Sequence, residues 1–173
     1  MKRIVTLAAL FMLSSHGVWA AGTQQDMQAA MQRMQEAQAK LMASMMVDKK
    51  SRFGFNETVS ALQDAAKKRG WEIGPVMDMQ EAMIKAGHKT AKPFKMLVMC
   101  NKDLAENLIK AQVAQKAMPF APCRLSVFEG NDGKVYIAKP NTELMAQMAT
   151  PAFAPLLKQF AEEENALLAK IIE

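Results

Sequence analysis

Two short apolar segments carry the two cysteines of this chain, and they constrain its fold most strongly. Residues 94–100 end in Cys100, and residues 122–129 begin with the pair Pro122-Cys123. Each segment has the length and apolar content of a strand, and a helical pattern lies between them. If the strands are antiparallel neighbours, both sulfur atoms lie at the same end of one sheet. The sequence therefore predicts a sheet organised around these two segments.

Side-chain alternation along each strand predicts the side on which its sulfur lies. Cys123 shares its side with Leu125 and Val127. Cys100 shares its side with three apolar residues: Phe94, Met96 and Val98. Both cysteines are therefore expected on apolar sides of the sheet, facing each other.

The first twenty residues have the pattern of a secretory signal peptide. Lys2 and Arg3 precede an apolar run over residues 4–13, and residues 18–20 (Val-Trp-Ala) fit a cleavage site before Ala21. The run is short for a membrane span and no second run follows, so no stable span is expected after cleavage; an uncleaved anchor is the alternative. We therefore predict an exported, periplasmic protein.

Export and charge together narrow the expected partners. An oxidising compartment makes one disulfide the default expectation for two cysteines. The 22 Lys and Arg residues exceed the 17 Asp and Glu residues to give a net charge of +5, which falls to +3 once Lys2 and Arg3 are removed with the signal peptide, and the cations are scattered along the chain. This pattern, together with export, argues against a nucleic-acid partner.

Residues 21–44 are rich in Met, Gln and Ala and predict one helix. Met27, Met31 and Met34 follow one another at spacings of four and three, which places them on one side of that helix. Packing against an apolar surface is one interpretation, since methionine is a flexible space-filler. The other is that the thioethers bind a soft metal ion, Cu(I).

Strand and helix patterns alternate from residue 45 onward. The expected elements are, in order, a strand within 45–55, a helix capped by Asn56 and ending before Gly70, a strand over 71–79, a helix over 80–86, the first cysteine strand, a helix over 102–117 capped by Asn101, the second cysteine strand, a strand over 134–139, a helix over 142–148 and an amphipathic helix within 156–172. Pro75 lacks an amide donor, so its strand is expected at an edge or with a bulge. We therefore predict an α+β fold with helices on one face of a mainly antiparallel sheet.

Six short motifs then follow one another along the chain: Asn56-Glu57-Thr58-Val59, Gly70-Trp71, Asp78-Met79-Gln80, Met99-Cys100-Asn101, Pro122-Cys123-Arg124 and Asp132-Gly133-Lys134-Val135-Tyr136. Together they resemble the domain-of-unknown-function 302 (DUF302) family over roughly Val47 to Met148. Lys102 departs from the family pattern, which usually has proline after Cys-Asn. With the residue patterns on either side, the sequence predicts three parts after the signal peptide: the 21–44 helix, a DUF302-like domain over 45–149 and a C-terminal helix over 150–173.

The resemblance implies a TATA-binding-protein-like β-α-β(4)-α arrangement and a homodimer. Likeness to that fold carries no implication of DNA binding. No activity is assigned to the family, so the resemblance predicts architecture and leaves the chemistry open.

The candidate site lies at the cysteine end of the sheet. Cys100 and Cys123 are interpreted as a structural disulfide, as buried thiols, or as a redox-active or metal-binding pair. Asn101 and Arg124 adjoin them, although alternation sends the Arg124 side chain to the other face. His88 is interpreted as a solvated loop residue, or as a ligand if it meets the sulfur atoms in space.

The sequence lacks the common enzyme motifs, including a glycine-rich phosphate loop, a Ser-His-Asp set and zinc-spaced Cys/His clusters. We therefore favour an exported, non-catalytic ligand-binding or accessory protein with its site at the Cys100/Cys123 end. The alternatives are a thiol–disulfide redox protein that uses these two cysteines, and a Cu(I)-binding protein that uses the methionine helix with or without them.

Overall fold

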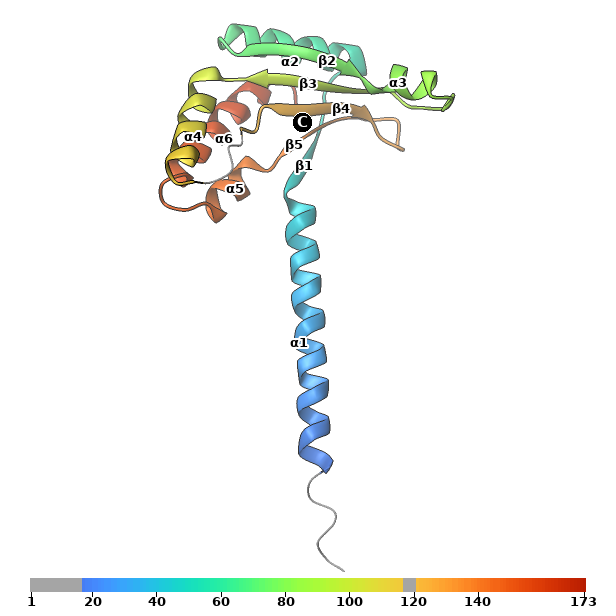
Figure 1. The fold of residues 1–173 in the computed structure, drawn as a ribbon. Coiled ribbons are helices and arrows are strands. Elements are labelled where there is room, and N and C mark those ends of the chain that lie inside the picture. The colour runs from blue at the N-terminus through green and yellow to red at the C-terminus, as the bar shows by residue number, and fades with distance from the viewer. Residues whose placement is uncertain (1–16, 117–120) are drawn as a thin grey trace, which may run out of the picture. The chain divides into compact units, whose positions relative to one another are not determined.

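The computed structural model of the protein describes residues 17–116 and 121–173, with side chains described from residue 24 onward. Most of the predicted signal peptide, residues 1–20, lies outside this range. The chain divides into two compact units, residues 1–43 and residues 44–173. The described part of the first unit is helix α1 (Gly17–Ser44), whose methionine-rich half was predicted from the sequence (Figure 1).

The second unit is an α+β domain built on a five-stranded sheet (Figure 1). Its elements are β1 (Met46–Lys50), α2 (Phe55–Lys68), β2 (Glu72–Asp78), α3 (Met79–Lys85), β3 (Phe94–Cys100), α4 (Lys102–Ala114), β4 (Arg124–Glu129), β5 (Val135–Pro140), α5 (Thr142–Met148) and α6 (Ala154–Leu168). The strand order is β1-β5-β4-β3-β2, and every neighbouring pair is antiparallel. The predicted fold class is confirmed.

One face of the sheet forms the core together with helices α2, α4 and α6. Leu97 pairs with Leu125, and Val127 pairs with Ile137, so these side chains lie on the same face. They join one buried cluster with Leu62 of α2 and with residues of the other two helices: Leu104, Ala105, Phe160, Leu167 and Leu168. The three helices pack on this face because each of them is amphipathic and turns its apolar stripe toward the sheet.

The opposite face of the sheet carries apolar side chains that are not buried. Phe94, Met96 and Val98 of β3 are half-buried, and Phe128 stacks on Tyr136 with 5.6 Å between the ring centroids. The sequence grouped Cys100 with this side of β3, whereas the buried side is that of Leu97 and Met99. Alternation separates the two sides of a strand, but both sides of β3 are apolar, so the pattern could not show which one is covered.

Both edge strands match their sequence signals. β1, which carries Lys49 and Lys50, lies at one edge, and β2 lies at the other. The register of β2 shifts between Ile73 and Val76, at Pro75, so the predicted bulge is present. Gly74 lies against β3 within this bulge, where a Cβ atom would come within 3.1 Å of the Cβ of Val98. A larger residue at position 74 would therefore push the two strands apart.

Asparagine side chains cap two helices, of which the Asn101 cap was predicted. The Oδ1 of Asn101 accepts a hydrogen bond from the amide of Leu104 at 3.2 Å, and the Oδ1 of Asn141 accepts one from Leu144 at 3.1 Å. Helix α4 begins at Lys102, directly after its predicted cap Asn101. The prediction for α2 was wrong: its cap is Gly54, and Asn56 lies inside the first turn.

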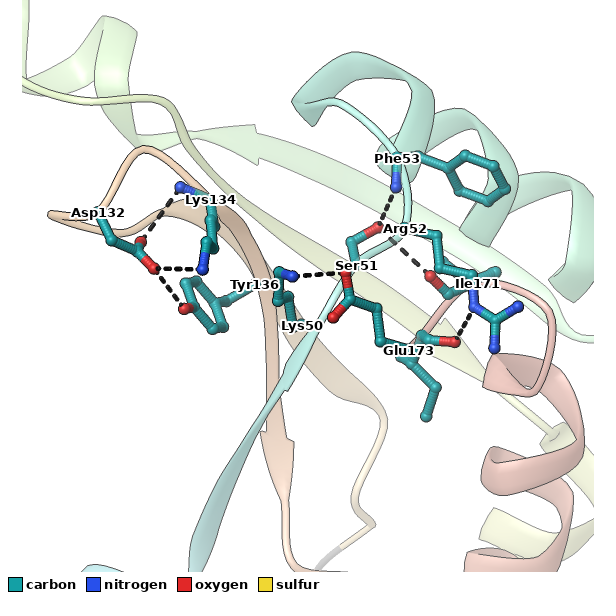
Figure 2. A network of polar contacts seen from close by, with 10 residues as sticks. Lys50, Ser51, Arg52, Phe53, Asp132, Lys134, Tyr136, Ile171 and Glu173 are labelled. Atoms are coloured by element: carbon teal, nitrogen blue, oxygen red, sulfur yellow. Dashed lines mark hydrogen bonds and ion pairs between the residues drawn. The ribbon is translucent and has the colours of Figure 1, made fainter.

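The last residues of the chain are bound to β1, which fixes the end of α6 (Figure 2). The amide of Glu173 donates to the carbonyl of Lys50 at 3.0 Å, and the two side chains form an ion pair. The amide of Arg52 donates to the carbonyl of Ile171 at 2.9 Å. Helix α6 is therefore part of the same folded unit as the sheet. None of the helices in the described part of the chain has the length and apolar character to cross a membrane.

Candidate functional site

Cys100 and Cys123 form a disulfide with a Cα–Cα distance of 4.7 Å. Cys100 is the last residue of β3, and Cys123 immediately precedes β4. The amide of Met99 donates to the carbonyl of Cys123 at 3.0 Å and extends the strand pairing to this point. Register would put the two side chains on opposite faces, but Cys123 lies outside the regular strand and the bond forms at the sheet end. The prediction that these residues meet is confirmed.

Both cysteines are partly exposed and pack against the core cluster. Each residue therefore contacts the core and keeps part of its surface toward solvent. On the core side, Cys123 borders a cavity of about 10 Å³, together with Trp71, Lys139 and Glu164. This volume holds about one water molecule. It is far smaller than the roughly 300–1,000 Å³ of a typical small-molecule pocket, so this cavity has no room for an organic ligand.

A buried ion pair forms part of the wall of this cavity. The Nζ of Lys139 lies 3.0 Å from the Oε2 of Glu164, and their side chains are 4% and 8% exposed. The hydroxyl of Thr142 donates to the same carboxylate oxygen. Burial raises the pKa of Glu164 above its ordinary value, although Lys139 and Thr142 act in the opposite direction.

The sequence analysis missed this ion pair, although each partner leaves a signal. Lys139 occupies a core-facing position of β5, two residues after the buried Ile137. Glu164 lies between Phe160 and Leu167 on the apolar side of α6. A charged residue on the apolar side of a strand or helix indicates a buried partner, because an unpaired buried charge is costly.

Trp71 connects this region to the core. Its ring contacts that of Phe160 edge to face, with 5.9 Å between the centroids. Its Nε1 is buried and has no hydrogen-bond partner among the described residues. Since Trp71 also borders the cavity, the indole adds a polar donor near Cys123 and Glu164.

The remaining predicted site residues do not meet at the disulfide. Asn101 caps α4, and Arg124 is exposed on the face opposite the core, paired with Val98. His88 is exposed in the turn after α3, at the end of β2 and β3 that lies away from Cys100. The structure therefore joins the two cysteines and leaves His88 apart. In the described residues, no three His, Cys, Asp or Glu side chains group to hold a metal ion.

Met27, Met31 and Met34 lie on α1 and are 61%, 54% and 65% exposed. Their side chains are therefore accessible, either to another apolar surface or to a soft metal ion. Binding of Cu(I) by these residues stays a prediction.

The Cu(I) prediction expects the triple variant Met27→Leu, Met31→Leu, Met34→Leu to bind about one equivalent less Cu(I) than the wild-type chain. A coloured Cu(I) chelator in competition with the protein measures the stoichiometry. The matched control replaces three exposed methionines of the domain, Met46, Met77 and Met148, by leucine. Equal stoichiometry in all three proteins would remove the methionine helix from copper binding.

A larger, open cleft of about 620 Å³ lies between α5 and α6. Small apolar residues, among them Ala146 and Ala161, line it beside the polar residues Glu143, Lys158 and Asn165. The amide of Asn165 donates to the carboxylate of Glu143 at 2.6 Å. Neither cysteine borders this cleft, so a ligand of this size would bind elsewhere than at the predicted site.

These features define an α+β domain in which an open antiparallel sheet carries a disulfide at one end. The family model "Domain of unknown function DUF302" matches residues 47–173, and the chain belongs to this family. The resemblance stated from the sequence motifs is confirmed. The match also includes α6 and the C-terminal residues that bind β1.

A solved structure shows the same fold. It is the crystal structure of an uncharacterized conserved protein DUF302 from Bacillus stearothermophilus, with a TM-score of 0.62 and 24% sequence identity; the match covers 73% of this chain and 97% of that chain. At this identity the likeness shows the fold alone. No curated protein is significantly similar to the chain. The comparisons therefore establish family and fold, and the homodimer implied by the resemblance stays a prediction.

Proposed function

We propose that this protein is an exported thiol–disulfide redox protein whose Cys100–Cys123 bond is reduced and formed again by partner proteins. The observation that carries the proposal is a disulfide that is partly exposed on one side and adjoins a buried, ionisable cluster on the other. Exposure admits the attacking thiolate, and a nearby ionisable group can move the proton that exchange requires. Export, predicted from residues 1–20, would place the protein where disulfides persist.

The partner class is a protein or small molecule with two thiols. Its first thiolate attacks one sulfur of the bond and forms a mixed disulfide, which releases the other cysteine as a thiolate. Its second thiol then attacks the mixed disulfide and releases the remaining cysteine. The partner loses two electrons and two protons and becomes a disulfide, while Cys100 and Cys123 become thiols. The same steps run backwards when the protein reduces a partner.

A non-catalytic binding protein is the second candidate, favoured by the open cleft between α5 and α6. The first site predicted for such a function, at the cysteine end, has less support because the cavity there holds about one water molecule. Binding and redox activity would therefore use different parts of the domain.

The redox proposal predicts that a dithiol buffer reduces the bond while the protein stays folded. Alkylation of free thiols followed by mass spectrometry gives the reduced fraction at each buffer potential, and circular dichroism follows the fold in the same samples. The reduced protein should be about 3 kcal/mol less stable, as expected for a loop closed across a sequence separation of 23.

The variant Cys100→Ser, Cys123→Ser is the control, since it should match the stability of the reduced protein and show no redox transition. If the thiols of the wild-type chain become accessible only as the protein unfolds, the bond is structural and the redox proposal is wrong.

A further inference from the structure

We infer that Glu164 is the proton donor and acceptor for Cys123 when the Cys100–Cys123 bond is broken or formed. This inference rests on the proposed redox function and assigns a role to a residue of helix α6. Cys123 and Glu164 border the same cavity, although they lie on different elements of the fold. General acid–base catalysis requires hydrogen-bond reach, directly or through one water molecule.

The cavity has the size and the polar groups for such a transfer. Its volume of about 10 Å³ holds about one water molecule. The buried Nε1 of Trp71 can donate a hydrogen bond to that water, and the carboxylate of Glu164 can accept one. On this route the proton moves between Glu164 and Cys123 through that water, since both residues border the cavity.

The surroundings of Glu164 shift its carboxyl toward the protonated form. Burial raises the pKa of its carboxyl, and the neighbouring charge of Glu143 acts in the same direction. Lys139 and Thr142 lower the pKa through their contacts with the carboxylate. Arg124 also borders the cavity, but its exposed side chain belongs to the other face of the sheet.

The two cysteines then have different roles. A partner thiolate attacks the Sγ of Cys100, the S–S bond breaks, and its electron pair goes to the Sγ of Cys123. The Cys123 thiolate takes the proton from Glu164, and the ammonium of Lys139 compensates the charge of the carboxylate that remains. The second partner thiol releases Cys100, which takes its proton from solvent. In the opposite direction, the Glu164 carboxylate accepts the proton of Cys123 as that thiol attacks.

The test compares the rate of reduction by dithiothreitol in the wild-type chain, in Glu164→Gln and in Glu162→Gln, an exposed position on the same helix. The rate is measured from about pH 5 to about pH 9 by acid quenching and alkylation, and divided by the thiolate fraction of the reagent. The corrected wild-type rate is expected to fall as pH rises through the pKa of Glu164, since only the protonated carboxyl donates. Glu164→Gln is expected to be about 100-fold slower, with no such step, and Glu162→Gln should match the wild type.

The outcomes separate this inference from the proposed function. If the wild-type bond is reduced in the folded protein but Glu164→Gln has the same rate and pH profile, the redox function stands and the role of Glu164 is wrong. If the wild-type bond resists reduction until the protein unfolds, both are wrong. Glu164→Asp keeps a carboxyl in the cavity and replaces the glutamine variant if that one does not fold. It should retain the pH step at a shifted midpoint, and a flat profile would overturn the inference.

Discussion

Replacing Phe160 with alanine is expected to destabilise the protein by about 3–5 kcal/mol. Phe160 is fully buried on α6, in the cluster that joins this helix to the sheet, and its ring lies against that of Trp71. Truncation removes the apolar contacts and the edge-to-face ring contact, and leaves a cavity that the surrounding strands and helices cannot close. Urea unfolding, followed by circular dichroism, measures the change in the free energy of unfolding.

Two further variants test whether the loss in Phe160→Ala comes from burial and from the volume of the side chain. Val113→Ala removes an apolar side chain that is 57% exposed on α4, and should change the free energy of unfolding by less than about 0.5 kcal/mol. Phe160→Leu keeps most of the apolar volume and should lose about 1–2 kcal/mol. A loss below about 1 kcal/mol in Phe160→Ala would mean that α6 does not anchor the core as described.

Replacing Lys139 with methionine is expected to destabilise the protein by about 3–5 kcal/mol at about pH 8, because it leaves the Glu164 carboxylate buried without its cationic partner. The double variant Lys139→Met, Glu164→Leu should recover most of that loss, since it removes both charges. As a control, Lys102→Met breaks the exposed pair with Glu72, in which the side chains are 71% and 66% exposed, and should cost less than about 0.5 kcal/mol.

The pH dependence of the Lys139→Met variant has a definite sign. Loss of the ammonium removes an influence that lowers the pKa of Glu164, so the raised pKa rises further in the folded state. A folded-state pKa above the unfolded one means that the folded protein binds the proton more tightly. The deficit of the variant should therefore shrink as pH falls through the folded-state pKa of Glu164. A deficit that is the same at about pH 8 and about pH 5 would contradict the role of the buried carboxylate.

Local signals account for the parts of the fold that the sequence predicted. Asn101 and Asn141 begin helices because an asparagine oxygen can accept from an amide three residues later, wherever the helix packs. Pro75 indicated an edge strand or a bulge, because it has no amide to donate to a second neighbour, and β2 shows both. The cap of α2 escaped prediction because Gly54 has no side chain to mark it.

The candidate site was predictable to a smaller extent. The pairing of Cys100 with Cys123 followed from two strand patterns and an even cysteine count, and the structure contains that bond. The ion pair between Lys139 and Glu164 was not predicted, because it joins two residues that are 25 positions apart in the chain. Each residue taken alone resembles an ordinary charge on a strand or helix, and the distance that joins them comes from the packing of α6 on the sheet.

The sequence by itself determined the order of strands and helices along the chain, since this order depends on hydrogen bonds and apolar periods among near neighbours. Its motifs indicated the family, and its two cysteines made one disulfide the default expectation. The tertiary structure decided which side of β3 is buried, which charges meet beneath the disulfide and how little space is left there. Those properties depend on the packing of elements from distant parts of the chain, because burial belongs to the assembled layers and to no single segment.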